Sequence, residues 1–155
     1  MQYEDIRKAR DGLVQLIDQM NTIMRRRFME TYERISDYFY HIFRDLFGGG
    51  NARLVMEEGV DPLESGIEIE VQPPGKDLRS LSLMSGGEKA MTCIALLFAL
   101  FKNAPSQFCI LDEVDAPLDE INIGRLMNIL QQFLDQSQFI LISHSKKTMA
   151  EANTI

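Results

Sequence analysis

The chain has 155 residues, 45% of them hydrophobic, so it can bury one sizeable core, and one domain with an appendage is expected. Its net charge of -7 argues against a surface built mainly for nucleic acid. The first five residues are too polar for a secretory signal and the longest apolar run, from Ala90 to Phe101, is too short to span a bilayer, so we expect a cytoplasmic protein.

Residues 3–46 carry a helical apolar pattern. Its first six positions repeat at alternating steps of three and four, the a/d seam of a coiled coil: Ile6, Ala9, Leu13, Leu16, Met20 and Ile23. After Arg25-Arg26-Arg27 the apolar stripe resumes one residue out of phase and becomes rich in aromatic residues. Such a helix is too long to lie wholly against a domain of this size. We therefore expect a coiled-coil arm over residues 1–27 and a globular part over 28–155, with a surface helix of wide apolar face as the alternative.

The three successive arginines point around a helix rather than along one face, so they are interpreted as a solvated turn, with direct contact to DNA phosphates as the alternative. Cys93 and Cys109 both lie in apolar runs and are expected to be small buried hydrophobic residues. Neither cysteine has metal-ligand spacing with the two histidines.

Three consecutive glycines, Gly48 to Gly50, follow the helical pattern and predict the end of the helix. A glycine run can also cradle phosphate, but this one lacks the following helix start and the lysine that such a loop uses. Two strands are expected next, over 52–57 and 66–71. The second alternates apolar residues, expected on a buried face, with glutamates on a solvated one.

The segment Ser85-Gly86-Gly87-Glu88-Lys89 predicts the start of a helix. Ser85 and Glu88 have the spacing of a capping box, in which each side chain bonds to the backbone of the other residue. The two glycines are not explained by capping, because glycine costs about 1 kcal/mol relative to alanine inside a helix. Close approach of another backbone or of an anionic ligand would offset that cost, since a helix N-terminus attracts anions. A glycine-softened helix start without a ligand is the alternative.

A strand, a helix and a second strand follow, over 107–111, 119–135 and 138–142. This spacing predicts a right-handed crossover in a parallel sheet. Parallel strands end on the same edge of a sheet, where such folds bind ligands. The sequence therefore predicts a common crevice for the residues after the two strands.

Asp112, Glu113 and His144 are the residues delivered to that edge. Asp112 can hold Mg²⁺, Glu113 can polarise an attacking water as general base, and His144 can contact a terminal phosphate. Acids that cap the next turn, and a histidine that caps the helix beginning near Ser145, are the alternatives. Together with a Ser-Gly-Gly helix start in the same chain, these residues indicate a catalytic edge.

Four segments resemble the motifs of ABC-type ATPases: the signature (SGGEK, 85–89), a Walker B strand (FCILDE, 108–113), a D-loop (APLD, 116–119) and the switch histidine (His144). The sequences of further segments are similar to the C-terminal head segment of bacterial SMC (structural maintenance of chromosomes) proteins. These segments are FRDLFGGG at 43–50, QPPG at 72–75 and LSLMSGGEK at 81–89. The similarity covers most of the chain from about Phe28 onward.

The resemblance implies an α/β fold, the C-terminal lobe of an ABC-type ATPase head with parallel strands and crossover helices, and a projecting N-terminal coiled-coil helix. It implies that heads bind ATP and Mg²⁺ on a P-loop from the N-terminal segment and that two heads dimerise around two ATPs. Ser85, Gly86 and Gly87 would then contact the γ-phosphate held by the opposite head, and Asp119 would lie at the seam between heads. Further implied partners are a kleisin subunit and, through the complete complex, the DNA of the nucleoid.

No P-loop is present in the sequence, because a Walker A loop requires G-x-x-x-x-G-K-[ST]. The nearest candidate, Gly75-Lys76, has Glu70 in place of the first glycine and Asp77 in place of the hydroxyl residue. We therefore expect a head fragment that needs the N-terminal lobe in order to bind nucleotide and is inactive alone. The alternatives to an ATPase half-site are a non-catalytic docking lobe that binds a partner such as the kleisin, and another coiled-coil ABC ATPase of DNA repair.

Overall fold

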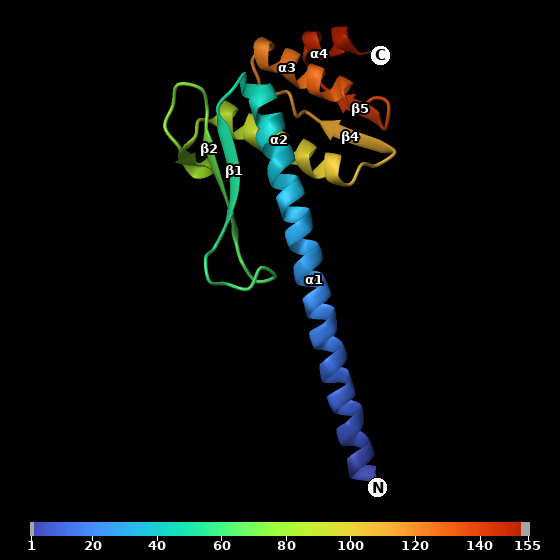
Figure 1. Cartoon of the computed structure of the whole chain (residues 1–155). Helices are drawn as coiled ribbons and strands as arrows, with labels where there is room; N and C mark the ends of the chain where they lie inside the picture. The colour runs from blue at the N-terminus through green and yellow to red at the C-terminus, as the bar shows by residue number, and fades with distance from the viewer. Residues whose placement is uncertain (1, 153–155) are drawn as a thin grey trace.

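A single long helix organises the computed structural model, which describes residues 2–152. Helix α1 spans Gln2–Phe47, and its 46 residues correspond to about 69 Å at 1.5 Å per residue. Figure 1 shows α1 running away from the remaining elements, which gather around its C-terminal part. The helical pattern predicted over residues 3–46 is confirmed, and it forms one helix with no break at the arginines.

The two parts of α1 differ in burial. The apolar residues of its N-terminal part are exposed, including the predicted seam residues Ile6, Leu13, Leu16, Met20 and Ile23. Toward the C-terminus α1 buries one side against α2, α3 and β1, and four of its side chains belong to the core: Phe39, Ile42, Phe43 and Leu46. An exposed a/d seam of this kind is typical of a helix that pairs with a second helix in a coiled coil.

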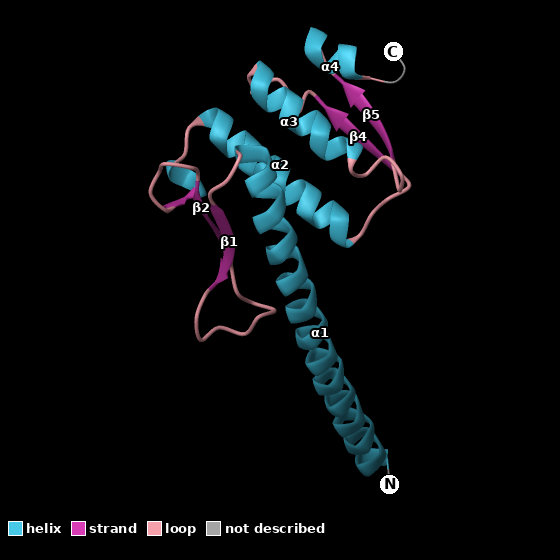
Figure 2. Ribbon diagram, turned by 45° about the horizontal axis from the view of Figure 1, so that its top comes forward, coloured by secondary structure: helices cyan, strands magenta, loops and turns pink. Residues whose placement is uncertain are grey.

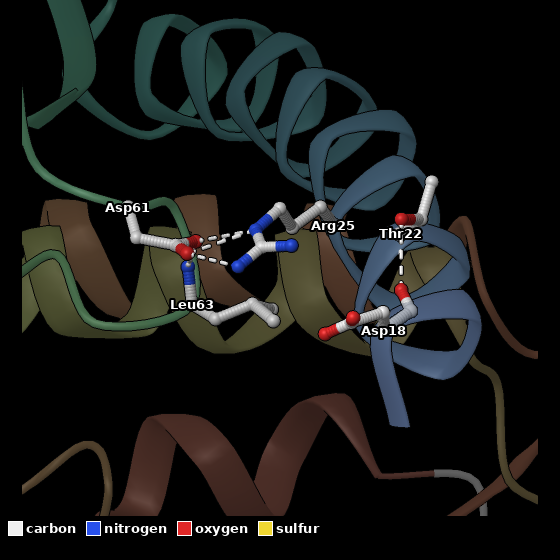
Figure 3. A network of polar contacts seen from close by, with 5 residues as sticks. All are labelled: Asp18, Thr22, Arg25, Asp61 and Leu63. Atoms are coloured by element: carbon white, nitrogen blue, oxygen red, sulfur yellow. Dashed lines mark hydrogen bonds and ion pairs between the residues drawn. The ribbon is translucent and has the colours of Figure 1, made fainter. Parts of the chain in front are cut away.

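The prediction of a solvated turn does not hold for Arg25, because its side chain pairs with Asp61. Its Nε donates to both carboxylate oxygens of Asp61, at 2.9 and 2.8 Å, and Nη2 also binds Asp61. Figure 3 shows this contact, together with the backbone amide of Leu63, which donates to Asp61 at 3.1 Å. The connection between the first two strands is thereby fastened to the arm by residues 36 positions apart, which periodicity along the helix does not reveal.

The pair makes a pH-dependent contribution to stability. Hydrogen bonding by Arg25, followed by that of the Leu63 amide, lowers the pKa of Asp61 below its ordinary value of 3.8. A carboxyl whose folded pKa is lowered adds stability above the unfolded value, and the contribution is lost as pH falls through the folded pKa. We expect Asp61→Asn to lower the melting temperature at about pH 7 and to have a smaller effect at about pH 2, well below the ordinary pKa of 3.8, because the contribution of the carboxylate is lost as pH falls.

Thermal unfolding followed by circular dichroism measures this difference. Asp11→Asn is the matched control, because Asp11 pairs with Arg10 on the exposed part of the same helix and such pairs contribute little. An equal loss for Asp61→Asn at both pH values would show that the carboxylate charge is not what stabilises this contact.

The glycine run ends α1 as predicted. Gly48, Gly49 and Gly50 all have positive φ, and the amide of Gly49 donates to the carbonyl of Arg44 at 2.9 Å. Strand β1 (Asn51–Met56) follows directly and pairs antiparallel with β2 (Ile67–Gln72).

A short third strand, β3 (Arg79–Ser80), pairs antiparallel with β2 and completes a sheet in the order β1-β2-β3. The predicted burial of one face of β2 is correct only at its C-terminal end, since Val71 is buried but Ile67 is exposed. A 3₁₀ turn, η1 (Leu81–Leu83), then leads into α2.

Helix α2 (Gly86–Asn103) packs along α1 and supplies much of the core. Its buried side chains recur at helical spacing: Met91, Thr92, Ile94, Ala95, Phe98 and Ala99. Phe98 stacks on Phe133, and its ring centroid lies 5.6 Å away. The face of α2 that points away from this core carries Cys93, which is exposed, and Cys109 on the next strand is half-buried, so the prediction of two buried cysteines is wrong.

The second sheet holds the predicted strand-helix-strand unit. Strand β4 (Phe108–Asp112) and β5 (Gln138–Ile142) pair in parallel, with α3 (Glu120–Gln131) between them in sequence. Figure 2 shows these two strands beside each other next to α3. Helix α3 ends four residues earlier than expected, and residues 132–136 form a turn.

One face of this two-stranded sheet is bare. Cys109, Leu111, Phe139 and Leu141 contact or belong to the core. The alternate positions are apolar and each roughly half exposed: Phe108, Ile110, Ile140 and Ile142. A short helix, α4 (Lys146–Glu151), packs against α3 and closes the described part of the chain. Among residues 2–152, none of the helices combines the length and the hydropathy needed to cross a bilayer.

Candidate functional site

The carboxyl ends of β4 and β5 bring three predicted residues to one edge. Asp112 is the last residue of β4 and is in register with Ile142, the last residue of β5. His144 lies two residues beyond β5, and its Nε2 is 3.5 Å from Oε1 of Glu113. The predicted convergence is seen for Glu113 and His144, and Asp112 lies at the same edge as the last residue of β4.

Glu113 has an unusual backbone. Its φ is +49°, and it alone among the non-glycine residues in the described part of the chain has positive φ. The amide of Glu113 donates to the carbonyl of Ile142 at 2.8 Å, which continues the ladder between the two strands. A left-handed non-glycine residue costs about 1–3 kcal/mol and persists where the surroundings hold it, often at functional sites. The turn directs the Glu113 side chain outward, with 56% of it exposed.

The site lies on open surface. The His144 side chain is 94% exposed, and Asp112 and Glu113 are exposed as well, so all three can reach a ligand supplied from outside. A pocket of about 740 Å³ lies elsewhere, between the end of α3, β5 and the end of α4. A large pocket is often the first candidate for a site, but Asp112, Glu113 and His144 do not line this one.

Asp112 fits Mg²⁺ as part of a shared coordination shell. No group of three or more His, Cys, Asp or Glu side chains within residues 2–152 could hold a metal by itself. Mg²⁺ at nucleotide sites is commonly bound by one or two carboxylates together with water and substrate phosphates. The exposed carboxylate of Asp112 at the strand end suits that arrangement.

Asp119 is the N-cap of α3. Its Oδ1 accepts a hydrogen bond of 2.8 Å from the amide of Asn122, which satisfies one of the free amides of the first turn. The residue is exposed. Its side chain therefore has a structural contact in this chain, and its position at a seam between heads stays a prediction.

The helix start at Ser85 is formed as predicted. Ser85 and Glu88 make the capping box, and Oε2 of Glu88 accepts from both the amide and the hydroxyl of Ser85, at 3.2 and 2.8 Å. Ser85, Gly86 and Gly87 are all exposed. The first amides of a helix have no carbonyl partner within it, so this tip presents backbone donors to solvent.

The two glycines differ in their surroundings. A Cβ at Gly86 would meet nothing within 4 Å, so no part of the described chain requires glycine there. A Cβ at Gly87 would lie 3.5 Å from the carbonyl oxygen of Pro117, in the turn that follows Glu113. That distance is an ordinary van der Waals contact, so the described chain does not require glycine at Gly87 either, although the helix tip lies beside the turn that joins Glu113 to Asp119.

Sequence reasoning missed one residue of this tip. The Nζ of Lys76 lies 2.6 Å from Oε1 of Glu88, so a lysine, a glutamate and the serine form a chain of contacts. Hydrogen bonding by Lys76, then by Ser85, lowers the pKa of Glu88 below its usual range. Lys76 entered the sequence analysis only as part of a failed P-loop match, and the signal that it lies near Glu88 is three-dimensional.

Comparison with known proteins identifies relatives along nearly the whole chain. A family model described as "RecF/RecN/SMC N terminal domain" matches residues 7–155. The chain is similar to the chromosome partition protein Smc of Rhodopirellula baltica, with 53% identity over 154 residues. That alignment covers 99% of this chain and 13% of the relative, so the chain spans a small part of the curated protein that it matches.

Solved structures agree in fold. A structure described as "Structural biochemistry of ATP-driven dimerization and DNA stimulated activation of SMC ATPases" has a TM-score of 0.79 and 42% identity, and the match covers 84% of this chain and 80% of that one. A Smc head domain from Pyrococcus furiosus, with an extended coiled coil and bound to the C-terminal domain of ScpA, has a TM-score of 0.83 and 40% identity. It covers 92% of this chain and 36% of that one.

Proposed function

Because the chain belongs to the RecF/RecN/SMC family, we propose that it is the C-terminal half of the ATP-hydrolysing head of an SMC protein of chromosome condensation and segregation. The observation that carries the proposal is the convergence of Asp112, Glu113 and His144 at one exposed strand edge, with the Ser85 helix tip beside the adjoining turn. The cofactors are ATP and Mg²⁺, and the site works in a dimer of complete heads.

Placement in the C-terminal half rests on the residues. The sequence carries the signature, the Walker B strand, the D-loop and the switch histidine, and it contains no match to G-x-x-x-x-G-K-[ST]. The matching family model is described as an N-terminal domain, so this placement draws its support from the motifs alone. The P-loop that holds the nucleotide is supplied by another lobe, in the same natural chain or a separate one.

The bare face of the second sheet is the docking surface we assign to that lobe. Phe108, Ile110, Ile140 and Ile142 expose about half of their surface on adjacent parallel strands. Parallel sheets are usually covered on both faces, and here the core covers only one. A lobe that continues the sheet and covers this face would also bring a bound nucleotide to the strand edge where Asp112 and Glu113 lie.

The roles that we assign to these residues are those that the ABC-type motifs imply. Asp112 helps to hold Mg²⁺, Glu113 draws the proton from the attacking water, and His144 donates to the terminal phosphate. The amides at Gly86 and Gly87 and the hydroxyl of Ser85 bind the γ-phosphate on the opposite head. Mg²⁺ neutralises charge on the phosphates when it is bound.

Other partners fit the same proposal. The Pyrococcus furiosus head was solved with the C-terminal domain of ScpA, which supports a kleisin-type subunit as a partner of this segment. The exposed seam of α1 takes a second helix as a coiled coil. We further propose that DNA is contacted through the complete complex and that the protein is cytoplasmic and associated with the nucleoid. The competing proposal is a docking lobe that binds a kleisin and does not hydrolyse ATP.

Mixing the chain with a P-loop-bearing SMC head lobe tests the proposal. We expect nucleotide binding and ATP turnover only in the mixture, with ATP driving head dimerisation measured by sedimentation. The isolated chain should bind no nucleotide above background. Stable assembly of the two lobes without any turnover would overturn the ATPase proposal and favour the docking lobe.

A further inference from the structure

Asp115 is a buried carboxylate that the proposed chemistry does not use. It lies in the turn after β4 and is 4% exposed. Its Oδ2 accepts hydrogen bonds from two hydroxyls, Oγ of Ser143 at 2.5 Å and Oγ1 of Thr148. A carboxylate removed from water is costly unless donors replace the lost hydration. Both donors come from one segment, so burial of Asp115 depends on where that segment lies.

The segment is the loop that carries His144. Ser143 directly precedes the histidine, and its Oγ also accepts from the amide of Ser145 at 2.9 Å. Thr148 lies four residues after His144 in α4 and is itself buried. The imidazole is almost wholly exposed, so packing does not hold it in place. Its position therefore depends on this loop backbone, which Asp115 anchors on both sides.

The main chain of Asp115 holds the other side of the site. Its carbonyl accepts from the amide of Leu118 at 3.0 Å, and the amide of Ala116 donates to the carbonyl of Glu113 at 3.1 Å. These bonds shape the turn between Glu113 and Asp119. One residue thus links the turn that carries the acid to the loop that carries the histidine.

We propose that Asp115 is a positioning residue that keeps His144 within reach of Glu113, through Ser143 and Thr148. Because Asp115 is buried, its effect passes through the residues that it contacts. The geometric claim concerns this chain alone. Its catalytic consequence rests on the proposed ATPase function, and the two are tested separately.

The histidine signals in NMR spectra test the geometry without nucleotide. The chain has 2 histidines, so the imidazole signals are few. Because His144 lies 3.5 Å from Glu113, we expect Glu113→Gln to shift the His144 signals. In the Asp115→Ala background this response should fall by more than half. Asp115→Asn should preserve most of the response, because an amide oxygen can accept both hydroxyls. His41, which lies 3.4 Å from Asp37 on α1, is the internal reference.

Two serines at opposite ends of β5 give a matched pair of variants. Ser143→Ala removes one of the donors to Asp115 and should weaken the His144 response. Ser137→Ala removes a comparable buried bond, from Oγ of Ser137 to the carbonyl of Ser106 at 2.5 Å, and should leave the response unchanged. If Asp115→Ala fails to fold, Ser143→Ala against Ser137→Ala decides the question.

Turnover in the two-lobe mixture measures the consequence. We expect Asp115→Ala to lower kcat about 10- to 100-fold, as for residues that orient metal ligands, with little change in KM because the other lobe holds the nucleotide. A full His144 response in folded Asp115→Ala, or an equal loss of response in Ser143→Ala and Ser137→Ala, would overturn the proposal. Failure of the wild-type mixture to turn over ATP would count against the proposed function and leave the NMR result decisive.

Discussion

Replacing Glu113 with Gln is expected to lower ATP hydrolysis by the two-lobe head about 10²- to 10⁴-fold, the usual contribution of a general base. Glutamine keeps the shape of the side chain and can still hydrogen bond to water, but it cannot accept the proton. The side chain is exposed at the strand edge beside Asp112, where water and nucleotide both have access. Steady-state release of phosphate from the mixture measures the effect.

Dimerisation separates loss of chemistry from loss of the site. Glu113→Gln should preserve ATP-driven dimerisation, and it should lengthen the lifetime of the dimer because the bound ATP is no longer consumed. Glu120→Gln is the matched control, since Glu120 is also an exposed glutamate and is the first residue of α3. If Glu113→Gln hydrolyses ATP as fast as Glu120→Gln, the general base is another residue.

The positive φ of Glu113 gives this prediction a structural context. The turn is held by the bond from its amide to Ile142 and by the bond from Ala116 to its carbonyl. Glutamine has no better access to this conformation than glutamate, so the strain is the same in both proteins. A loss of activity in the variant therefore reports the carboxylate and not a change of backbone.

Local patterns in the sequence were sufficient for the elements that depend on neighbouring residues. The capping box at Ser85 needs only residues three apart, and the end of α1 needs only its glycines. The strand at 138–142 was predicted with the bounds observed, because a short apolar run between polar residues is typical of a buried strand. Convergence of Glu113 and His144 followed from a rule about parallel strands, since that rule fixes which ends meet.

Contacts between distant residues could not be predicted in this way. Arg25 with Asp61 and Lys76 with Glu88 each join segments whose approach depends on the whole fold. The exposure of Cys93 has a related cause. An apolar run in a helix puts some members on the outer face, and which face is outer depends on where α1 packs. Whether a residue in an apolar run is buried therefore depends on how the helices and strands pack, and not on the run itself.

Gly50→Ala is expected to destabilise the chain by about 2–6 kcal/mol, the sum of two costs. Its φ of +88° is one that L residues rarely adopt, at about 1–3 kcal/mol. A Cβ there would also overlap the carbonyl oxygen of Gln72 and lie 3.2 Å from Cδ of Pro74 and 3.3 Å from Cε1 of Phe43, and crowding of this kind costs about 1–3 kcal/mol. Urea unfolding followed by circular dichroism measures the loss.

Comparison with Gly59→Ala separates the cost of the overlap from the conformational cost. Gly59 has φ of +79°, but a Cβ there would meet nothing within 4 Å, so this variant carries the conformational cost without the overlap. Its loss of unfolding free energy should be clearly smaller than that of Gly50→Ala. Equal losses would mean that Pro74 and Gln72 move aside freely. The difference matters for function because Gly50 follows the end of α1 and Pro74 precedes Lys76, which pairs with Glu88 at the helix tip, so the overlap tests a contact between the end of α1 and the loop that carries Lys76.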